Sequence, residues 1–312
     1  MENQTILYML ALSGLSDLPS LQLPLFLVFL LVYLMTLTGN LLIVLLICTD
    51  SHLQTPMYFF LGTLACLDIG CSSVTTPRLV FDFHRQNRLI SVKSCICQIF
   101  FFVFFVISEL SLLAVMSYDR YVAICHPLHY TQIMHWKACV LLVLETFVIS
   151  VVYSLIHVLF LLKLTFCSLK PLQNFFCDLP QLLLVSCSDT FINVLLIFSL
   201  GILLAVCIFS LTFCPYIIIL NTIMKMQSKA MRSKAFSTCS SHLTVVFIFY
   251  GTALFSYFHP NSKGFSAVDK FASVFYTILT PLINPLIYSL RNKEIKISLK
   301  KTLYNAIGPK PQ

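Results

Sequence analysis

Charged residues are scarce in this sequence. Asp, Glu, Lys and Arg make up 10% of its 312 residues, whereas hydrophobic residues make up 58%. Soluble globular domains carry about 25% charged residues, so this composition excludes an ordinary soluble domain and predicts a membrane protein. The formal net charge of +8 does not indicate a nucleic-acid partner, because much of it borders apolar runs, beside anionic membrane lipid.

The sequence also lacks the short motifs of common enzyme active sites. It contains no HExxH, no GxSxG, no Gly-rich phosphate loop and no CxxC pair. We therefore expect no enzymatic activity and no metal centre. Internal repeats are absent too, which counts against the paired halves of many transporters. A membrane transporter or channel for small solutes stays as the alternative function.

Seven apolar runs are present, each long enough to cross a bilayer as a helix of about 20 residues. They lie near residues 23–48, 57–80, 95–118, 138–162, 191–224, 236–258 and 271–290. Gly and Pro within several runs do not argue against helix, because neighbouring helices can satisfy the freed backbone groups. The sequence predicts an all-α membrane protein in which residues 1–312 form one seven-transmembrane helix bundle.

The two ends of the chain are expected on opposite sides of the membrane, because the number of spans is odd. The N-terminus lacks a basic segment and a small-residue cleavage site, so no cleaved signal peptide is expected. Asn3 begins a glycosylation sequon, which favours an extracellular N-terminus, residues 1–22. The cytoplasmic tail, residues 291–312, is basic and has apolar residues every four positions, as in an amphipathic helix lying on membrane lipid: Ile295, Leu299 and Leu303.

The connection from residue 163 to 190 is the longest between the runs, and it holds Cys167, Cys177 and Cys187. Cysteines in an oxidising outer compartment indicate disulfides. Most of the other cysteines lie in or near apolar runs, where a free cysteine behaves as a small hydrophobic residue.

Polar residues within the apolar runs are costly in lipid and are expected to face the bundle interior. At about 100° per residue, Glu109 lies three turns before Arg120 on nearly the same face, and Phe102 lies two turns before Glu109. Asp68 lies midway along the second run. The carboxyl groups of Asp68 and Glu109 either share a monovalent cation or a proton, or act only structurally as protonated acids.

Short stretches stand in a fixed order relative to the apolar runs: GN at 39–40, PMYFFLGTL at 56–64, MSYDRYVAICHPLHY at 116–130, SCSDT at 186–190, KAFSTCSSHLTVV at 234–246 and PLINPLIYSLRNKEI at 281–295. With these, the chain resembles the olfactory (odorant) receptors, rhodopsin-like class A G-protein-coupled receptors, almost from end to end. The resemblance implies a multi-pass protein of the plasma membrane.

The resemblance implies that Asp119 holds Arg120 in the inactive receptor. Arg120 is then released toward a stimulatory heterotrimeric G protein, which raises cAMP. Arg120 could instead anchor its helix at the membrane surface, but an anchor needs neither a preceding acid nor matching motifs on other helices. The other switch residues that the resemblance implies are Tyr121, Tyr216, Asn284, Pro285 and Tyr288.

A small, largely apolar volatile odorant is the ligand that the resemblance implies. If Phe102 faces inward, Phe105 and Val106 flank the same cavity, and the resemblance places Leu254 and Tyr257 across it. An opsin would need a lysine within 271–290, and none is present. An aminergic receptor would need an acid at the position of Phe102.

The resemblance also implies the pairing of the cysteines, Cys95 with Cys177 and Cys167 with Cys187. The sequence departs from the family pattern at several positions, which bear on trafficking and ligand class more than on the fold. These are Glu145, Phe147, Ser150, Asn174, Val194 and Pro215.

Overall fold

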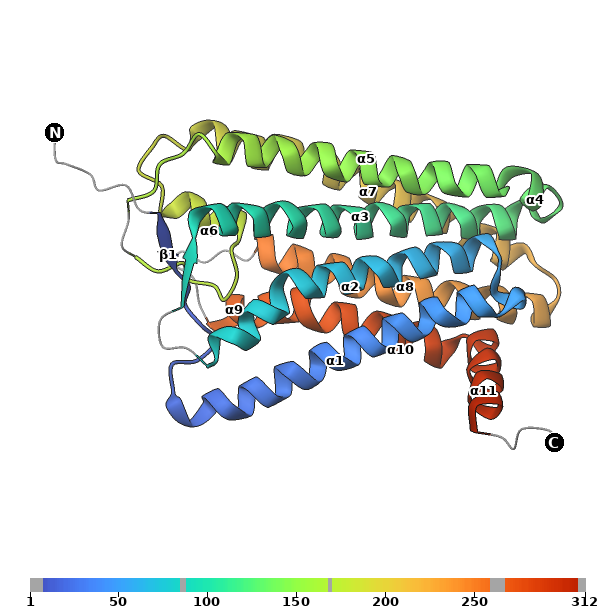
Figure 1. The fold of residues 1–312 in the computed structure, drawn as a ribbon. Helices are drawn as coiled ribbons and strands as arrows, with labels where there is room; N and C mark the ends of the chain where they lie inside the picture. The colour runs from blue at the N-terminus through green and yellow to red at the C-terminus, as the bar shows by residue number, and fades with distance from the viewer. Residues whose placement is uncertain (1–7, 85–87, 168–169, 259–266, 308–312) are drawn as a thin grey trace.

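Long helices lie side by side along most of the chain in this computed structural model (Figure 1). In order they are α1 (Pro19–Thr49), α2 (Pro56–Asp82), α3 (Val92–Cys125), α5 (Trp136–Leu161), α7 (Phe191–Lys225), α8 (Lys229–Phe258) and a last segment formed by α9 (Ala267–Val274), η3 (Phe275–Leu279) and α10 (Thr280–Arg291). The structure describes residues 8–84, 88–167, 170–258 and 267–307, apart from some side chains in α8, α9, α10 and the helix that follows α10.

Among the described residues, 6 helical segments are long and apolar enough to cross a membrane. The seventh helix of the bundle is α8, and its described residues include the apolar stretch His242–Thr252. The predicted fold class, a seven-helix membrane bundle, is confirmed.

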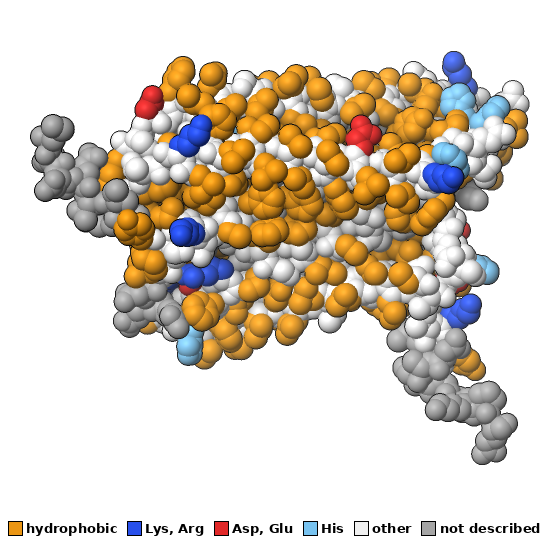
Figure 2. Space-filling view, turned by 45° about the horizontal axis from the view of Figure 1, so that its top comes forward, with side chains coloured by type: hydrophobic (Ala, Val, Ile, Leu, Met, Phe, Trp, Pro, Cys, Tyr) orange, Lys and Arg blue, Asp and Glu red, His pale blue; other side chains and the backbone are white. Residues whose placement is uncertain are grey.

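Apolar side chains cover the outside of the bundle, as lipid requires. Figure 2 shows hydrophobic side chains over most of one face, with the basic residues gathered mainly toward its two ends. Of these 6 segments, α7 faces outward most, since only 6% of its most apolar 18 residues are buried. Small polar residues line the inside instead, among them Thr75, Ser108 and Ser150. Small residues at helix contacts let backbones approach closely, as is usual in membranes.

The short elements lie at the two ends of the bundle. One end carries η1 (Ser51–Leu53), η2 (Pro127–His129), α4 (Tyr130–Ile133) and α11 (Lys293–Ile307), and we call it the switch end. There α11 turns away from the bundle axis (Figure 1). The phenol of Tyr58 on α2 donates to Glu294 Oε2 at 2.7 Å and to Asn292 Oδ1 at 3.1 Å. These bonds fasten α11 to the bundle.

The opposite end, which we call the disulfide end, carries a small sheet and the long connection. Strand β1 (Met9–Ala11) pairs antiparallel with β2 (Leu89–Ser91). Short α6 (Leu179–Leu184) lies within the long connection. Disulfides join Cys95 to Cys177 and Cys167 to Cys187, with Cα atoms 5.4 and 5.9 Å apart respectively. The long connection is thereby bound both to α3 and to itself.

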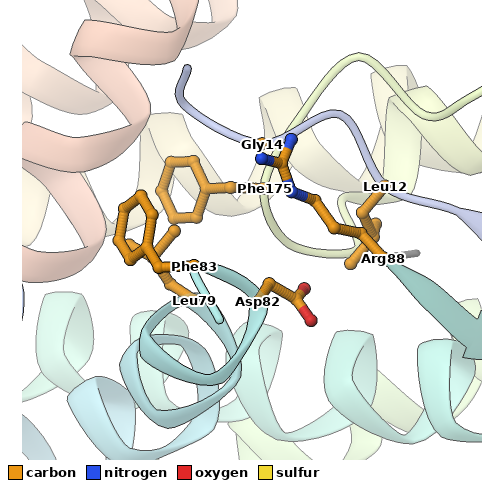
Figure 3. Close-up of a pocket in the computed structure, with 7 residues that line it drawn as sticks. All are labelled: Leu12, Gly14, Leu79, Asp82, Phe83, Arg88 and Phe175. Carbon is orange, nitrogen blue, oxygen red and sulfur yellow. The ribbon is translucent and has the colours of Figure 1, made fainter. Parts of the chain in front are cut away.

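The N-terminal segment closes part of the disulfide end. Asp17 pairs with Arg88 at 2.8 Å, and Lys270 donates to Ser13 Oγ at 2.9 Å and to Gly14 O at 2.8 Å. Beneath this segment is a hollow with no room for a water molecule. Figure 3 shows side chains of α2, the N-terminal segment and the long connection around it. The segment therefore acts as a cap on this side of the bundle.

Candidate ligand-binding and activation sites

The Asp119–Arg120 pair lies near the end of α3, at the switch end. The carboxylate of Asp119 is 1% exposed. It accepts hydrogen bonds from both Arg120 Nε, at 3.0 Å, and Arg120 Nη2. The phenol of Tyr130, on α4, also donates to it at 2.7 Å. With several donors on one carboxylate, Arg120 is held against its own helix.

Tyr130 was not singled out from the sequence, although it ends the MSYDRYVAICHPLHY stretch. Burial, and next the nearby Asp119 carboxylate, raise the pKa of the Tyr130 phenol. The phenol therefore stays protonated and remains a donor to Asp119. Tyr121 does not join this group, because its hydroxyl lies 3.0 Å from His126 Nε2.

Two other helices meet beside Arg120. The hydroxyl of Tyr216 on α7 lies 2.5 Å from Nδ1 of His242 on α8, and both side chains are buried. Arg120 is close enough to act electrostatically on both groups. His242 was not singled out from the sequence, although it lies in the KAFSTCSSHLTVV stretch, which could have indicated it. The Tyr216–His242 contact holds α7 and α8 together at the switch end.

The buried carboxyl groups of Asp68 and Glu109 lie near each other in the bundle interior, each 1% exposed. Asn284 Nδ2 donates to Asp68 Oδ1 at 2.9 Å and to Oδ2 at 3.2 Å. In the described part of the chain, Glu109 Oε1 has no hydrogen-bond partner. The site therefore offers more carboxylate oxygens than donors, which is the chemistry of a cation or proton site.

Pro285 and Tyr288 follow Asn284 on α10, and both are buried. The Tyr288 hydroxyl makes no hydrogen bond to the described residues. Nearby, Asn40 Nδ2 donates to the carbonyl of Pro281 at 3.0 Å, which ties α1 to α10 just before Pro285. The GN stretch of α1 thus supports the proline-containing helix.

The predicted ligand region lies in the half of the bundle near the disulfide end. Phe102 is 3% exposed, and its ring centroid lies 5.1 Å from that of Phe176 and 5.8 Å from that of Tyr276. Val106, one turn deeper, is also buried. Phe105 turns differently, because its ring occupies the space where a Cβ on Gly70 of α2 would lie.

Phe176 and Tyr276 were missed from the sequence. Phe176 is in the long connection and Tyr276 is in η3, a π-helical turn, and such turns concentrate at functional sites. Asn174 Nδ2 donates to Ser273 Oγ at 3.2 Å, which ties the long connection to α9 above these rings. Leu254 and Tyr257 are in α8, but their side chains lie outside what the structure describes, as does Asn3.

Comparison with known proteins identifies the family. The family model described as olfactory receptor matches residues 29–306. The chain belongs to the olfactory receptor family. It is 47% identical over 309 residues to olfactory receptor 5B12 of Homo sapiens, with 98% of each chain covered. It is 46% identical over 311 residues to olfactory receptor 5AR1 of Mus musculus, with 100% of this chain and 99% of the relative covered.

The fold of the receptor is also similar to that of squid rhodopsin. The TM-score is 0.74 at 16% identity, covering 94% of this chain and 88% of the rhodopsin. The receptor is thus a multi-pass membrane protein with a rhodopsin-like fold, and it is not an enzyme. These findings confirm the family predicted from the sequence motifs.

The departures from the family pattern have different surroundings in the receptor. Asn174 is buried and bonded to Ser273, as described above. Pro215 lies within α7, directly before Tyr216. Glu145 is exposed on α5, among apolar side chains such as Leu141, Leu144 and Val148, and nothing in the structure explains an acid there.

Proposed function

We propose that this receptor binds small, largely apolar volatile molecules within its helix bundle and activates a stimulatory heterotrimeric G protein, which raises cAMP. The observation that carries the proposal is the clasp of Arg120 by Asp119 and Tyr130 at the switch end. A basic side chain held by hydrogen bonds that can be broken suits a switch better than a membrane anchor, which would extend toward lipid headgroups.

Odorant binding is proposed at the aromatic group of Phe102, Phe176 and Tyr276, together with Val106. These side chains are in close contact in this conformation. An odorant must therefore displace one of the rings, and Tyr276 in its π-helical turn is a part of the seventh span that can transmit this shift toward Asn284 and Pro285. Leu254 and Tyr257 of α8 complete the proposed site, with Tyr257 as a hydrogen-bond donor to oxygenated odorants.

Screening a panel of volatile compounds with a cAMP readout tests the proposal. We expect agonists to be small and weakly bound, at roughly micromolar concentrations, because a small ligand buries little apolar area at about 25 cal/mol per Å². Phe102→Ala should then weaken every agonist, whereas Phe101→Ala, on the neighbouring lipid-facing position, should not. Equal effects of the two substitutions would contradict the placement of the ligand.

The receptor is proposed to lie in the plasma membrane with the disulfide end outside. Both disulfides and the sequon at Asn3 favour this orientation, because disulfides persist in oxidising compartments. The switch end then faces the cytoplasm and the G protein, and α11 lies on the inner leaflet.

A monovalent cation is proposed at Asp68 and Glu109. Thermal unfolding in NaCl, compared with choline chloride at equal ionic strength, tests this site. At a tenfold excess over Kd, a bound ion stabilises the folded state by about 1.4 kcal/mol. We expect Na⁺ to raise the Tm of the wild type and not that of Glu109→Gln. A wild-type Tm that is the same in both salts would instead assign a shared proton.

A further inference from the structure

A groove of about 470 Å³ lies at the disulfide end, between α2 and α3. Val74 and Arg78 line it from α2, Leu89 from β2, and Ser94, Cys97 and Phe101 from α3. The groove is separate from the proposed odorant site. Phe102, in the odorant site, is 3% exposed, whereas Phe101 next to it is 45% exposed and faces out of the bundle.

The apolar part of the groove opens on the lipid-facing surface. Leu89 and Phe101 are both nearly half exposed, and Cys97 is exposed as a free thiol. The wall behind them is rigid. Gln98 donates to the carbonyl of Val74 at 2.8 Å and accepts from the backbone N–H of Cys177 at 2.9 Å. A molecule in the groove would therefore meet a preformed surface that is continuous with the acyl chains of the bilayer.

The rim of the groove is polar and basic. Arg78 Nε donates to Asp82 at 2.9 Å, and Arg78 Nη2 donates to the carbonyl of Leu89 at 2.7 Å. These bonds fix the guanidinium group, and no hydrogen bond from Nη1 is found to the described residues. Ser94 Oγ, 2.8 Å from Ser91 Oγ, lies at the start of α3 on the same rim, and the exposed Lys93 directly precedes Ser94 in the sequence. Asp82 offsets the charge of Arg78, and the neighbouring Lys93 adds a second positive charge next to the groove.

We propose that this groove binds a phospholipid of the leaflet that borders the disulfide end. The phosphate group lies at Arg78 and Ser94, and one acyl chain lies over Val74, Cys97 and Phe101. Fixed guanidinium donors bind phosphate oxygens well. The position of the groove also fits. Its polar rim lies at the depth of the lipid headgroups and its apolar part at the depth of the acyl chains, and a phospholipid occupies both depths. The bound lipid would bridge α2 and α3 beside the Cys95–Cys177 disulfide.

A photoreactive lipid tests the proposal on the full receptor in phosphatidylcholine nanodiscs. The probe is a phosphatidylcholine with a diazirine in one acyl chain, and the adducts are mapped by peptide mass spectrometry. We expect several-fold more adducts at Cys97 and Phe101 than at Cys207 and Phe209, which are also exposed but lie on α7. Equal labelling of the two regions would show ordinary lipid contact and overturn the proposal.

Two substitutions separate the phosphate contact from the apolar contact. Arg78→Gln should reduce adducts in the groove about tenfold, which corresponds to the loss of one hydrogen bond to a charged group. Ser94→Phe should fill the rim and reduce them as well, while leaving the Arg78–Asp82 pair in place. The matched control is Ser199→Phe, at an exposed position of α7, which should change nothing in the groove. Unchanged groove labelling in Ser94→Phe would overturn the proposal even if Arg78→Gln does not fold.

Two further probes identify the head group. A diacylglycerol with the same diazirine chain lacks the phosphate, and a fatty acid with that chain carries a carboxylate in its place. We expect both to label the groove less than the phospholipid does. Equal or stronger labelling by either probe would overturn the assignment of the rim to a phosphate.

Discussion

Replacing Asp119 with asparagine is expected to raise cAMP without any odorant, and replacing Arg120 with glutamine is expected to abolish the odorant response. The two substitutions act on the same pair in opposite directions. Asp119→Asn removes the charge that holds the guanidinium, and each hydrogen bond to a charged group contributes about 1.5–3 kcal/mol. Its loss should increase the released population about tenfold or more. Arg120→Gln removes the charge that the G protein is proposed to contact.

The measurement is cAMP at matched surface expression, with a direct activator of adenylate cyclase as the control for the cell. Arg120→Gln leaves the buried Asp119 with Tyr130 but without its cation, and breaking a buried pair can cost about 3–5 kcal/mol of stability. The double variant Asp119→Asn/Arg120→Gln removes both charges and should fold. Undiminished odorant-evoked cAMP in the double variant would contradict the switch and favour a membrane anchor as the role of Arg120.

The second large effect is expected on removal of the Cys95–Cys177 disulfide. This bond spans 82 residues of sequence, and Cys167–Cys187 spans 20. In the chain-entropy account a longer closed loop gives more stability, so Cys177→Ser should lower the free energy of unfolding by roughly 4–5 kcal/mol and Cys167→Ser by about 3 kcal/mol. The backbone N–H of Cys177 also donates a hydrogen bond to Gln98. We expect this bond to be lost when the long connection is no longer held by the disulfide.

Thermal unfolding of purified receptor measures this difference, with surface expression as a second readout. Cys207→Ser is the matched control, because Cys207 is a free cysteine on the lipid-facing side of α7. We expect the control to have the highest Tm, Cys167→Ser a lower one and Cys177→Ser the lowest. If Cys177→Ser unfolds with the control, the disulfide contributes little to the folded state.

The sequence predicted the helices well because span length and apolar composition are set locally by the bilayer. Helix ends were less accurate. The third run was drawn to residue 118, whereas α3 continues to Cys125. The pairing of β1 with β2 joins residues about eighty positions apart, and strands of three residues carry no local signal for such a partner. The π-helical turn of η3 could not be predicted from the sequence either, since one extra residue in a turn leaves the apolar pattern of Phe275–Leu279 intact.

In the candidate sites, too, features set within one helix could be predicted, and contacts between segments could not. Helical periodicity alone placed Glu109 and Phe102 on an inward face, and both are buried. The same periodicity did not show that Phe105 would turn toward α2, because that depends on the missing side chain of Gly70, one helix away. Tyr130 and His242 lie inside the stretches that resemble the family, and Phe176 lies two residues after Asn174. Their partners come from other segments, and only the packed structure shows which atoms meet.

The cap formed by the N-terminal segment has a consequence for sensitivity. The hollow beneath it admits no water, and Asp17–Arg88 and Lys270–Ser13 hold the segment in place. If an odorant enters from this side, only the fraction of receptors with an open cap can accept it, and the apparent Kd is the intrinsic Kd divided by that fraction. Each 1.4 kcal/mol that stabilises the closed cap then raises the detection threshold about tenfold. Two contacts outside the proposed odorant site would in that way set the lowest odorant concentration that the receptor detects.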